Sequence, residues 1–293
     1  LARIVTGRDK IVRWGYHGWH DWCCTREAGI PNHVRDDTLT FAYNDLDSLE
    51  DTLKKNRDQV ACVIMMPLEI ELPRPGFLAG VQELAHRHGA LFILDEMRSG
   101  FHVALGGAQE YYGLRPDLAT FSKALSNGYA VSALVGRRAI MQRINETYVS
   151  STFFTNSIAM AAAVATIRKL RREQVIPHLW RVGQGLLDGL DRLAGEMGVE
   201  AKAVGLPPMP YLAFTYADAG VREAAKYAFY RHTTRRGVLL HPNHHWFVCA
   251  SHTERDLAHT LEVCAEGFGA VKEALAQGLR APGAPAVRVT VSS

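Results

Sequence analysis

Short apolar runs alternate with amphipathic stretches in the first half of this chain, and no other sequence feature constrains the fold as strongly. The apolar runs are KIVRWG (10–15), TLTFAY (38–43), ACVIMM (61–66), LFILDE (91–96), LATFS (118–122) and SALVG (132–136). Two stretches between them have helical spacing, LDSLEDTLKKN (46–56) and GFLAGVQELAHRHG (76–89). Nearly continuous apolar strands separated by helices indicate an α/β fold with a mostly parallel sheet that is covered on both faces.

The second half predicts long helices followed by a smaller α+β domain. An alanine-rich helix is expected after residue 156, and a stripe of leucines over 179–197 marks another. After them we expect a loop at 205–210 and three short strands, at 211–216, 238–240 and 246–250. Two helices are expected among these, at 221–235 and from Thr253 onward. Asp256 follows Thr253 by three residues, so Thr253 is the expected N-cap of the last helix. We expect residues 1–158 to be part of a large domain and 159–198 to be connecting helices. Residues 199–280 are expected to form a small C-terminal domain, and 281–293 a tail outside the core.

Composition and charge exclude several classes of function. The chain has 293 residues, with 33 Lys and Arg against 30 Asp and Glu, and the basic residues are scattered. We therefore expect no nucleic-acid partner. The longest apolar runs have only strand length, so no membrane span is expected. Five cysteines without CxxC spacing indicate reduced thiols, and we expect a cytoplasmic protein.

An acid and a lysine end two successive predicted strands. Asp95 closes LFILD, and ligands of open α/β sheets lie at the carboxyl ends of strands. Alternation along the strand places Asp95 and Met97 on one face and turns Glu96 to the other. Lys123 follows the next strand, so the two side chains meet at one rim if those strands are neighbours. A lysine that attacks a carbonyl must be partly desolvated, whereas most lysines are simply solvated cations.

The segment WGYHGWHDW (14–22) concentrates aromatic residues around two glycines. One interpretation is an aromatic corner of the core. The other is that Gly15 and Gly18 let the backbone turn and present Tyr16 and His17 at a strand end, where a flat side chain can stack on a planar ligand.

Two further motifs have both an ordinary and a functional interpretation. The hydroxyls of STFFTNSIAM (151–160) precede a helix and are either caps or part of an anion site. The histidines of HPNHHWF (241–247) suggest a metal-dependent hydrolase, but zinc needs three or four converging ligands. Because His244 and His245 are adjacent and face opposite ways on a strand, we expect no metal site.

An ordered series of motifs resembles one enzyme family. It is YHGWHD, YNDLDSLE, PRPGFLAGVQELAHRHGALFILDE, GGAQEYYGLRPDLATFSKALSNGY, ALVGRR, NSIAMAAAVATI, RGVLL and SHTERDL. Together they resemble the class III, fold-type I aminotransferases that depend on pyridoxal 5'-phosphate, and most closely the glutamate-1-semialdehyde 2,1-aminomutase branch. The resemblance implies the PLP-dependent transferase fold, with residues 1–158 in the cofactor-binding domain.

The resemblance also implies roles for individual residues. Lys123 is expected to bind the cofactor as a Schiff base and then to move the substrate proton. Asp95 is expected to pair with the pyridine nitrogen, so that the ring accepts electrons from the substrate carbon. Tyr16 is expected to stack on one face of the ring with His17 beside it, and Met97 to pack against the other. The implied reaction transfers an amino group between small amines and carbonyl compounds, as a transaminase or an aminomutase.

Other implications concern assembly and the ends of the chain. Thr152 matches the threonine that reaches the phosphate in the neighbouring subunit, which implies a homodimer with shared active sites. Met66 stands where the family has glutamate, and Ser99 and His102 replace threonine and arginine. The phosphate loop of the family is expected upstream of Leu1, so about a hundred residues or more are expected to be missing. The alternative to an active enzyme is a truncated, incompetent relative that keeps the fold without productive cofactor binding.

Overall fold

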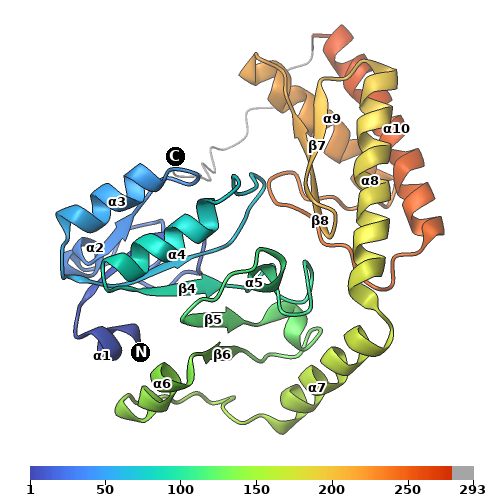
Figure 1. Ribbon diagram of the computed structural model, residues 1–293. Helices are drawn as coiled ribbons and strands as arrows, with labels where there is room; N and C mark the ends of the chain where they lie inside the picture. Colours follow the sequence, from blue (N-terminus) through green and yellow to red (C-terminus); the bar gives the residue numbers. More distant parts are fainter. Residues whose placement is uncertain (279–293) are drawn as a thin grey trace. The chain divides into compact units, whose positions relative to one another are not determined.

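The computed structural model describes residues 1–278, and they form two compact units (Figure 1). The first unit comprises Leu1–Glu69 and Pro73–Glu173. The second comprises Ile70–Leu72 and the described residues from Gln174 onward. The predicted tail, 281–293, lies outside the described residues.

A six-stranded sheet forms the centre of the first unit. Its strands are β1 (Lys10–Trp14), β2 (Thr38–Thr40), β3 (Val60–Met65), β4 (Leu91–Asp95), β5 (Leu118–Phe121) and β6 (Ala133–Gly136). Their order is β2-β1-β3-β4-β5-β6, and every neighbouring pair is parallel except β5 and β6. The six apolar runs therefore all form strands, and the predicted mostly parallel sheet is confirmed.

Helices cover both faces of this sheet because alternate strand residues point to opposite sides. On one face, Val12, Phe92 and Leu94 pack in a core that also contains Leu49 of α3 (Leu46–Lys55) and Val81 of α4 (Phe77–Arg87). The opposite face packs against α1 (Ala2–Thr6) and α6 (Arg138–Met141) through the side chains of Ala2, Ile11, Cys62, Ile93, Leu118 and Ile140. Both faces therefore pack mainly through apolar side chains.

Short helices and one long helix complete the unit. The short ones are α2 (Asn32–Asp36), α5 (Ala108–Tyr111) and the 3-10 helices η1 (Lys123–Leu125) and η2 (Gln142–Glu146). Helix α7 (Ser157–Arg172) is capped by Asn156, whose Oδ1 accepts the backbone N–H of Ile158 at 3.1 Å. Ser151 and Thr152 have hydroxyls that could cap a helix, but Asn156 caps this one instead.

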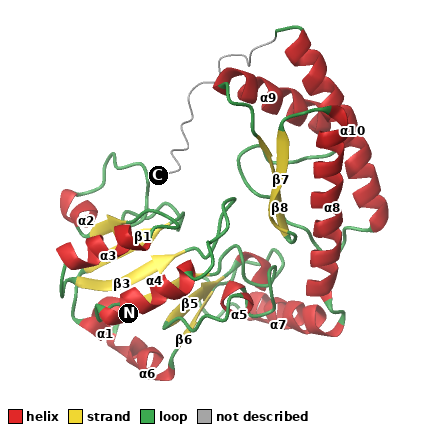
Figure 2. Cartoon of the chain, turned by 45° about the horizontal axis from the view of Figure 1, so that its top comes forward, coloured by secondary structure: helices red, strands yellow, loops and turns green. Residues whose placement is uncertain are grey.

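The second unit packs three helices with a two-stranded antiparallel hairpin (Figure 2). Its elements are α8 (Val175–Met197), β7 (Ala201–Leu206), β8 (Met209–Phe214), α9 (Ala219–Arg235) and α10 (Glu254–Ala276). The core includes the fully buried side chains of Leu190, Leu212, Phe229, Val263 and Phe268. Helix α7 belongs to the first unit and α8 to the second, so the two long helices each pack within a different unit.

Three predictions for this unit can be compared with the structure. The capping box of α10 is confirmed, because Asp256 N–H donates to Thr253 Oγ1 and Thr253 N–H donates to Asp256 Oδ2. The loop expected at 205–210 is instead the turn of the β7–β8 hairpin and the ends of both strands. The strands expected near 238–240 and 246–250 are wrong. Trp246 N–H bonds to Pro210 O and Val248 N–H to Pro208 O, but neither segment is assigned as a strand.

Within residues 1–278, none of the helices combines the length and the apolar character needed to cross a membrane.

Candidate active site

Four neighbouring strands of the first unit end at the same edge of the sheet. Trp14 of β1 lies beside Met65 of β3, Met65 beside Leu94 of β4, and Asp95 of β4 beside Thr120 of β5. Because these strands are parallel, the segments that follow them come together at one carboxyl edge. Those segments are 15–17, 66–69, 96–98 and 122–125. The edge therefore collects side chains that are far apart in the sequence.

A buried carboxylate and an imidazole are bonded at this edge. Asp95 is 5% exposed, and its Oδ2 lies 2.6 Å from Nδ1 of His17. Nε2 of the same ring lies 3.0 Å from the carbonyl oxygen of Trp14. The imidazole therefore bridges the carboxylate of Asp95 and the last residue of β1. Asp95 Oδ1 also accepts the N–H of Met97 at 3.0 Å, so the carboxylate is held in a fixed orientation.

Lys123 begins η1 directly beyond β5, in an unusual backbone conformation. Its φ is 46°, in the left-handed region that costs a residue other than glycine about 1–3 kcal/mol. The flanking loop is held by a bond from Ser122 Oγ to Val131 O at 2.7 Å. Although the residue as a whole is exposed, burial of the amine lowers the pKa of Lys123, Asp95 acts to raise it and Arg98 to lower it. The net lowering increases the neutral fraction of the amine, which is the form that attacks a carbonyl.

The other predicted residues lie at different distances from this centre. Tyr16 is 53% exposed, with the guanidinium carbon of Arg98 5.7 Å from its ring centroid. Met97 is half-buried and joins the centre through its backbone bond to Asp95. Thr152 is exposed in the segment before α7, and no hydrogen bond within residues 1–278 joins it to the other predicted site residues. The structure therefore brings five of the six together at one edge and leaves Thr152 apart.

Sequence reasoning missed two charged residues of this edge. Arg98 Nη1 donates to Glu69 Oε1 at 2.9 Å, and the two side chains are only 14% and 28% exposed. Nothing in the sequence distinguishes these residues from other charged residues, because the pair joins the ends of β3 and β4.

Met66 is buried, and an added Cβ on Gly15 would lie 3.0 Å from its Cε. The thioether therefore packs directly against the turn that leads to Tyr16.

Glu96 has a different role from its neighbour Asp95. It is 1% exposed and accepts the N–H groups of Ala108 at 2.9 Å and Gln109 at 2.7 Å, together with the hydroxyl of Ser99. Burial raises the pKa of Glu96. This carboxyl anchors the segment after β4 to the start of α5, on the side away from Asp95 that strand alternation predicts.

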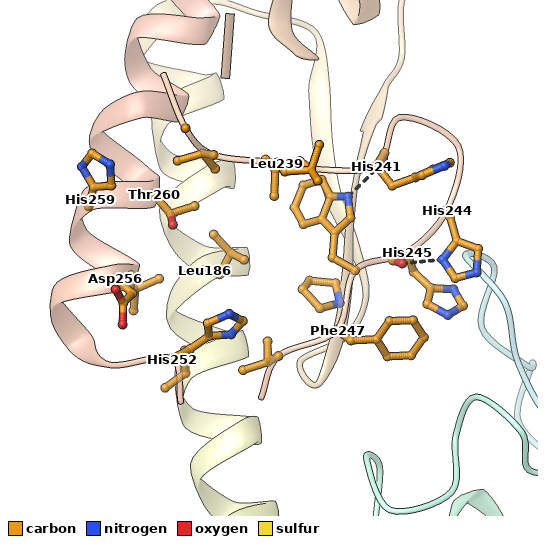
Figure 3. A pocket seen from close by; sticks show the side chains of 18 of the residues that line it. Leu186, Leu239, His241, His244, His245, Phe247, His252, Asp256, His259 and Thr260 are labelled. Carbon is orange, nitrogen blue, oxygen red and sulfur yellow. Dashed lines mark hydrogen bonds between the residues drawn. The ribbon is translucent and has the colours of Figure 1, made fainter. Parts of the chain in front are cut away.

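The histidine motif lies in the second unit, beside a cavity of about 810 Å³ (Figure 3). His241, His244 and His245 line it together with His252 and His259, among mainly apolar side chains. His244 and His245 lie on an irregular loop, so the strand assumed for them is wrong. In the described part of the chain, no three His, Cys, Asp or Glu side chains are grouped so that they could hold a metal ion. None of the six predicted site residues lines this cavity.

Comparisons with known proteins identify the family of this chain. The model of the family "Aminotransferase class-III" matches residues 25–246. The 3-aminobutyryl-CoA aminotransferase of Cloacimonas acidaminovorans is 42% identical over 94% of this chain and 68% of its own length. A glutamate-1-semialdehyde 2,1-aminomutase of Syntrophobacter fumaroxidans is 35% identical over 93% of this chain and 70% of its own length.

Two solved structures of pyridoxal-phosphate enzymes and transaminases share the fold of this chain. The FumI protein of Sphingopyxis sp. MTA144, solved as the internal aldimine of PLP, superposes with a TM-score of 0.88. It is 31% identical, and the match covers 94% of this chain and 68% of that one. An omega-transaminase of Sphaerobacter thermophilus superposes with a TM-score of 0.86 at 22% identity, which shows the shared fold alone.

The residues at the carboxyl edge fit pyridoxal phosphate chemically. A buried carboxylate such as Asp95 can accept a hydrogen bond from a protonated ring nitrogen, and an amine with a lowered pKa can attack an aldehyde. The half-exposed ring of Tyr16 can stack on a planar group. The family model over residues 25–246 and the relative with 42% identity show that the chain belongs to the class III aminotransferases, which transfer amino groups with pyridoxal phosphate as the cofactor.

Proposed function

We propose that Lys123 is the catalytic lysine of this enzyme and that it acts at the carboxyl edge of the sheet together with Asp95. The observation that carries this proposal is that both groups lie at the ends of the adjacent strands β4 and β5, with opposing effects of burial and charge on the lysine amine. Lys123 would hold the cofactor through its amine. Once free, the same amine would act as a general base and acid that moves the proton of the substrate carbon bearing the amino group.

The cofactor supplies an electron sink for the substrate carbon when it is bound. Asp95 would accept a hydrogen bond from its ring nitrogen, and the bond to His17 holds the carboxylate in place. Tyr16, beside His17, would stack on one face of the ring. Met97 would pack against the opposite face. These assignments rest on the positions of the four residues beside Lys123 and on the family pattern.

We propose a homodimer in which Thr152 binds the cofactor phosphate of the second copy. The segment around Thr152 supports this assignment, because it is rich in exposed apolar side chains. They are Tyr148, Val149, Phe153, Phe154, Ile158, Met160 and Val164. An exposed apolar surface of this kind is typical of a protein interface. A molar mass in solution equal to twice that of the chain supports the proposal, and a monomer at all concentrations contradicts it.

Transamination is the reaction that the relatives favour. The relative with 42% identity is named an aminotransferase of 3-aminobutyryl-CoA, whereas the aminomutase relative is 35% identical. We therefore propose small β-amino acyl thioesters as the first amine donors to assay, with glutamate 1-semialdehyde as the test for the aminomutase reaction. A cytoplasmic location is supported by five cysteines that are all free.

Substitution of the lysine tests this proposal directly. Lys123→Ala is expected to remove the visible absorbance of lysine-bound cofactor and to lower the rate of amino transfer by about 10²–10⁴-fold or more. Borohydride reduction of the parent protein followed by peptide mass spectrometry should place the pyridoxyl label on Lys123. Exposed Lys55, at the end of α3, provides a matched control, and Lys55→Ala should retain absorbance and activity. A label on another lysine, or turnover by Lys123→Ala at the parent rate, contradicts the proposal.

A further inference from the structure

Arg98 lies between three of the strand ends that form the carboxyl edge. It follows β4 by three residues, its side chain is only 14% exposed, and Nη1 donates to Glu69 beyond β3 at 2.9 Å. Its guanidinium carbon lies 5.7 Å from the ring centroid of Tyr16, beyond β1. Its charge also acts on Lys123, beyond β5. One side chain therefore contacts or influences a group from each of the other three strand ends.

We propose that Arg98 is a positioning residue of the Lys123 site. Its guanidinium, fixed by Glu69, holds the ring of Tyr16 and places a permanent positive charge near the lysine amine. This inference rests on the proposed function of Lys123. It adds a residue whose role is not to contact the reacting atoms but to set the protonation of one neighbour and the orientation of another.

The charge of Arg98 opposes that of Asp95 at the lysine. The charged groups that act on the amine are Asp95, which raises the pKa of Lys123, and Arg98, which lowers it after the larger effect of burial. His17 is bonded to Asp95 Oδ2. If the cation at 98 is removed, Asp95 acts unopposed and stabilises the protonated amine. The neutral fraction that can attack a carbonyl then decreases.

Glu69 explains why Arg98 can serve in this way. Two carboxylates of the edge, Asp95 and Glu69, could each attract the guanidinium. The short bond to Glu69 satisfies Arg98 and leaves Asp95 to His17 and to a ligand. An arginine suits this position because its planar group can bond a carboxylate along one edge and still lie over an aromatic ring.

The ring of Tyr16 needs such a contact because it is 53% exposed and follows the turn at Gly15, whose φ is 94°. A cation over one face restricts the orientations of the ring and leaves the opposite face for a planar ligand. The structure therefore links the residue proposed to stack on the cofactor with the residue that tunes the lysine.

The first experiment measures the ionisation of Lys123 without any cofactor. Competitive labelling with acetic anhydride across a pH series, with mass spectrometry of the Lys123 peptide, gives the apparent pKa of the amine. Arg98→Gln removes the charge but keeps a group that can donate to Glu69, and it should shift this pKa upward. Arg98→Lys keeps the charge and should leave the pKa close to that of the parent. Arg87→Gln, on the exposed end of α4, is the matched control and should cause no shift.

The result that overturns the charge effect is an unchanged pKa of Lys123 in Arg98→Gln, with a circular dichroism spectrum equal to that of the parent. Should Arg98→Gln fail to fold, the comparison moves to Arg98→Met and Arg98→Lys, with the same directions expected. The labelling needs neither cofactor nor turnover. Failure here therefore leaves the proposed function intact, whereas failure of the borohydride label to fall on Lys123 refutes the proposed function separately.

A double-mutant cycle tests the link to Tyr16. Affinity for pyridoxal 5'-phosphate is measured by absorbance titration for Arg98→Lys, Tyr16→Ala and the double variant. Arg98→Lys retains the charge, so its loss of affinity reports the guanidinium's hold on the ring. Because Arg98 acts on the ring of Tyr16, the two losses should not add, and the double variant should bind little worse than Tyr16→Ala alone. Strictly additive losses overturn the positioning of Tyr16 by Arg98.

Discussion

Two buried aspartates lie at opposite ends of the β4–β5 pair, and their hydrogen-bond partners differ. Asp95 ends β4 at the carboxyl edge, and Asp117 precedes β5 at the amino edge. Both are at most 5% exposed. Asp95 accepts bonds from His17 and from the N–H of Met97, and it lies near a lysine of lowered pKa.

Asp117 is bonded differently. Its two oxygens accept the N–H of Phe92 at 2.8 Å, Nε2 of His86 at 2.7 Å and Nη1 of Arg137 at 2.9 Å. These donors come from β4, α4 and the residue before α6, so the carboxylate holds three elements together. Identical side chains thus lie at the proposed ligand edge in one place and in a structural clamp in the other, because ligands of parallel sheets lie at the carboxyl edge, where several strand ends meet.

The largest effect that we expect is a loss of amino-transfer activity when Asp95, but not Asp117, is replaced. Asp95→Asn keeps the shape of the side chain but removes its charge, and amino transfer should fall by about 10²–10³-fold because the ring nitrogen loses its anionic partner. The apparent pKa of Lys123 should also fall, since Asp95 acts to raise it. Steady-state kinetics and competitive labelling measure the two effects. If Asp95→Asn turns over at the parental rate, Asp95 does not have the proposed role at the active site.

The next effect concerns stability at the other edge. Asp117→Asn leaves donors without an anionic acceptor and should lower the free energy of unfolding by about 2–3 kcal/mol. Burial alone would raise the pKa of Asp117, but the bonds from Phe92, Arg137 and His86 outweigh it and the pKa is lowered. A lowered folded pKa gives stability that is present above the unfolded pKa and lost as pH falls through the folded value.

The parent protein should therefore lose this stabilisation below about pH 4, the ordinary range of an aspartate, and Asp117→Asn should lose less there. Urea unfolding between pH 3 and 7 measures both curves. The amount of cofactor bound per folded Asp117→Asn molecule should equal that of the parent. Identical acid dependence in the two proteins would show that Asp117 is not the clamp described here.

The smallest effect refines the comparison, because Glu96 lies at the carboxyl edge and yet is structural. Glu96→Gln keeps one acceptor oxygen of two, and we expect a loss of about 1–2 kcal/mol in unfolding free energy. The pKa of Glu96 is raised by burial, so its contribution is present below the unfolded pKa and lost as pH rises through the folded value. The unfolding free energy of the parent should therefore decrease between about pH 4 and the folded pKa of Glu96, whereas that of Glu96→Gln should not. Calorimetric melting at several pH values tests this, and a steeper decline than in the parent would contradict it.

Much of the first unit could be predicted because its signals are local. Strand-length apolar runs, helical spacing and the chemistry of caps depend on neighbouring residues, and all six strands of the sheet follow them. Asp95 and Lys123 could be identified as candidates because each directly follows such a run. The small domain was harder, since the proline-rich segment 205–210 predicts a loop but gives no sign of β7, the strand that leads into it. The extended segments at 238–240 and 246–250 have strand composition but lie where no ladder forms.

The sequence by itself determined the apolar periodicity, and with it the mostly parallel sheet and the carboxyl edge at which Asp95 and Lys123 stand. Only the tertiary structure decided which residues meet there. The pairing of Arg98 with Glu69, the bond from His17 to Asp95 and the three donors to Asp117 all join segments that are distant along the chain. The physical reason is that secondary structure follows from interactions over a few residues, whereas the ionisation of a buried group depends on charges and donors that the order of the strands brings beside it.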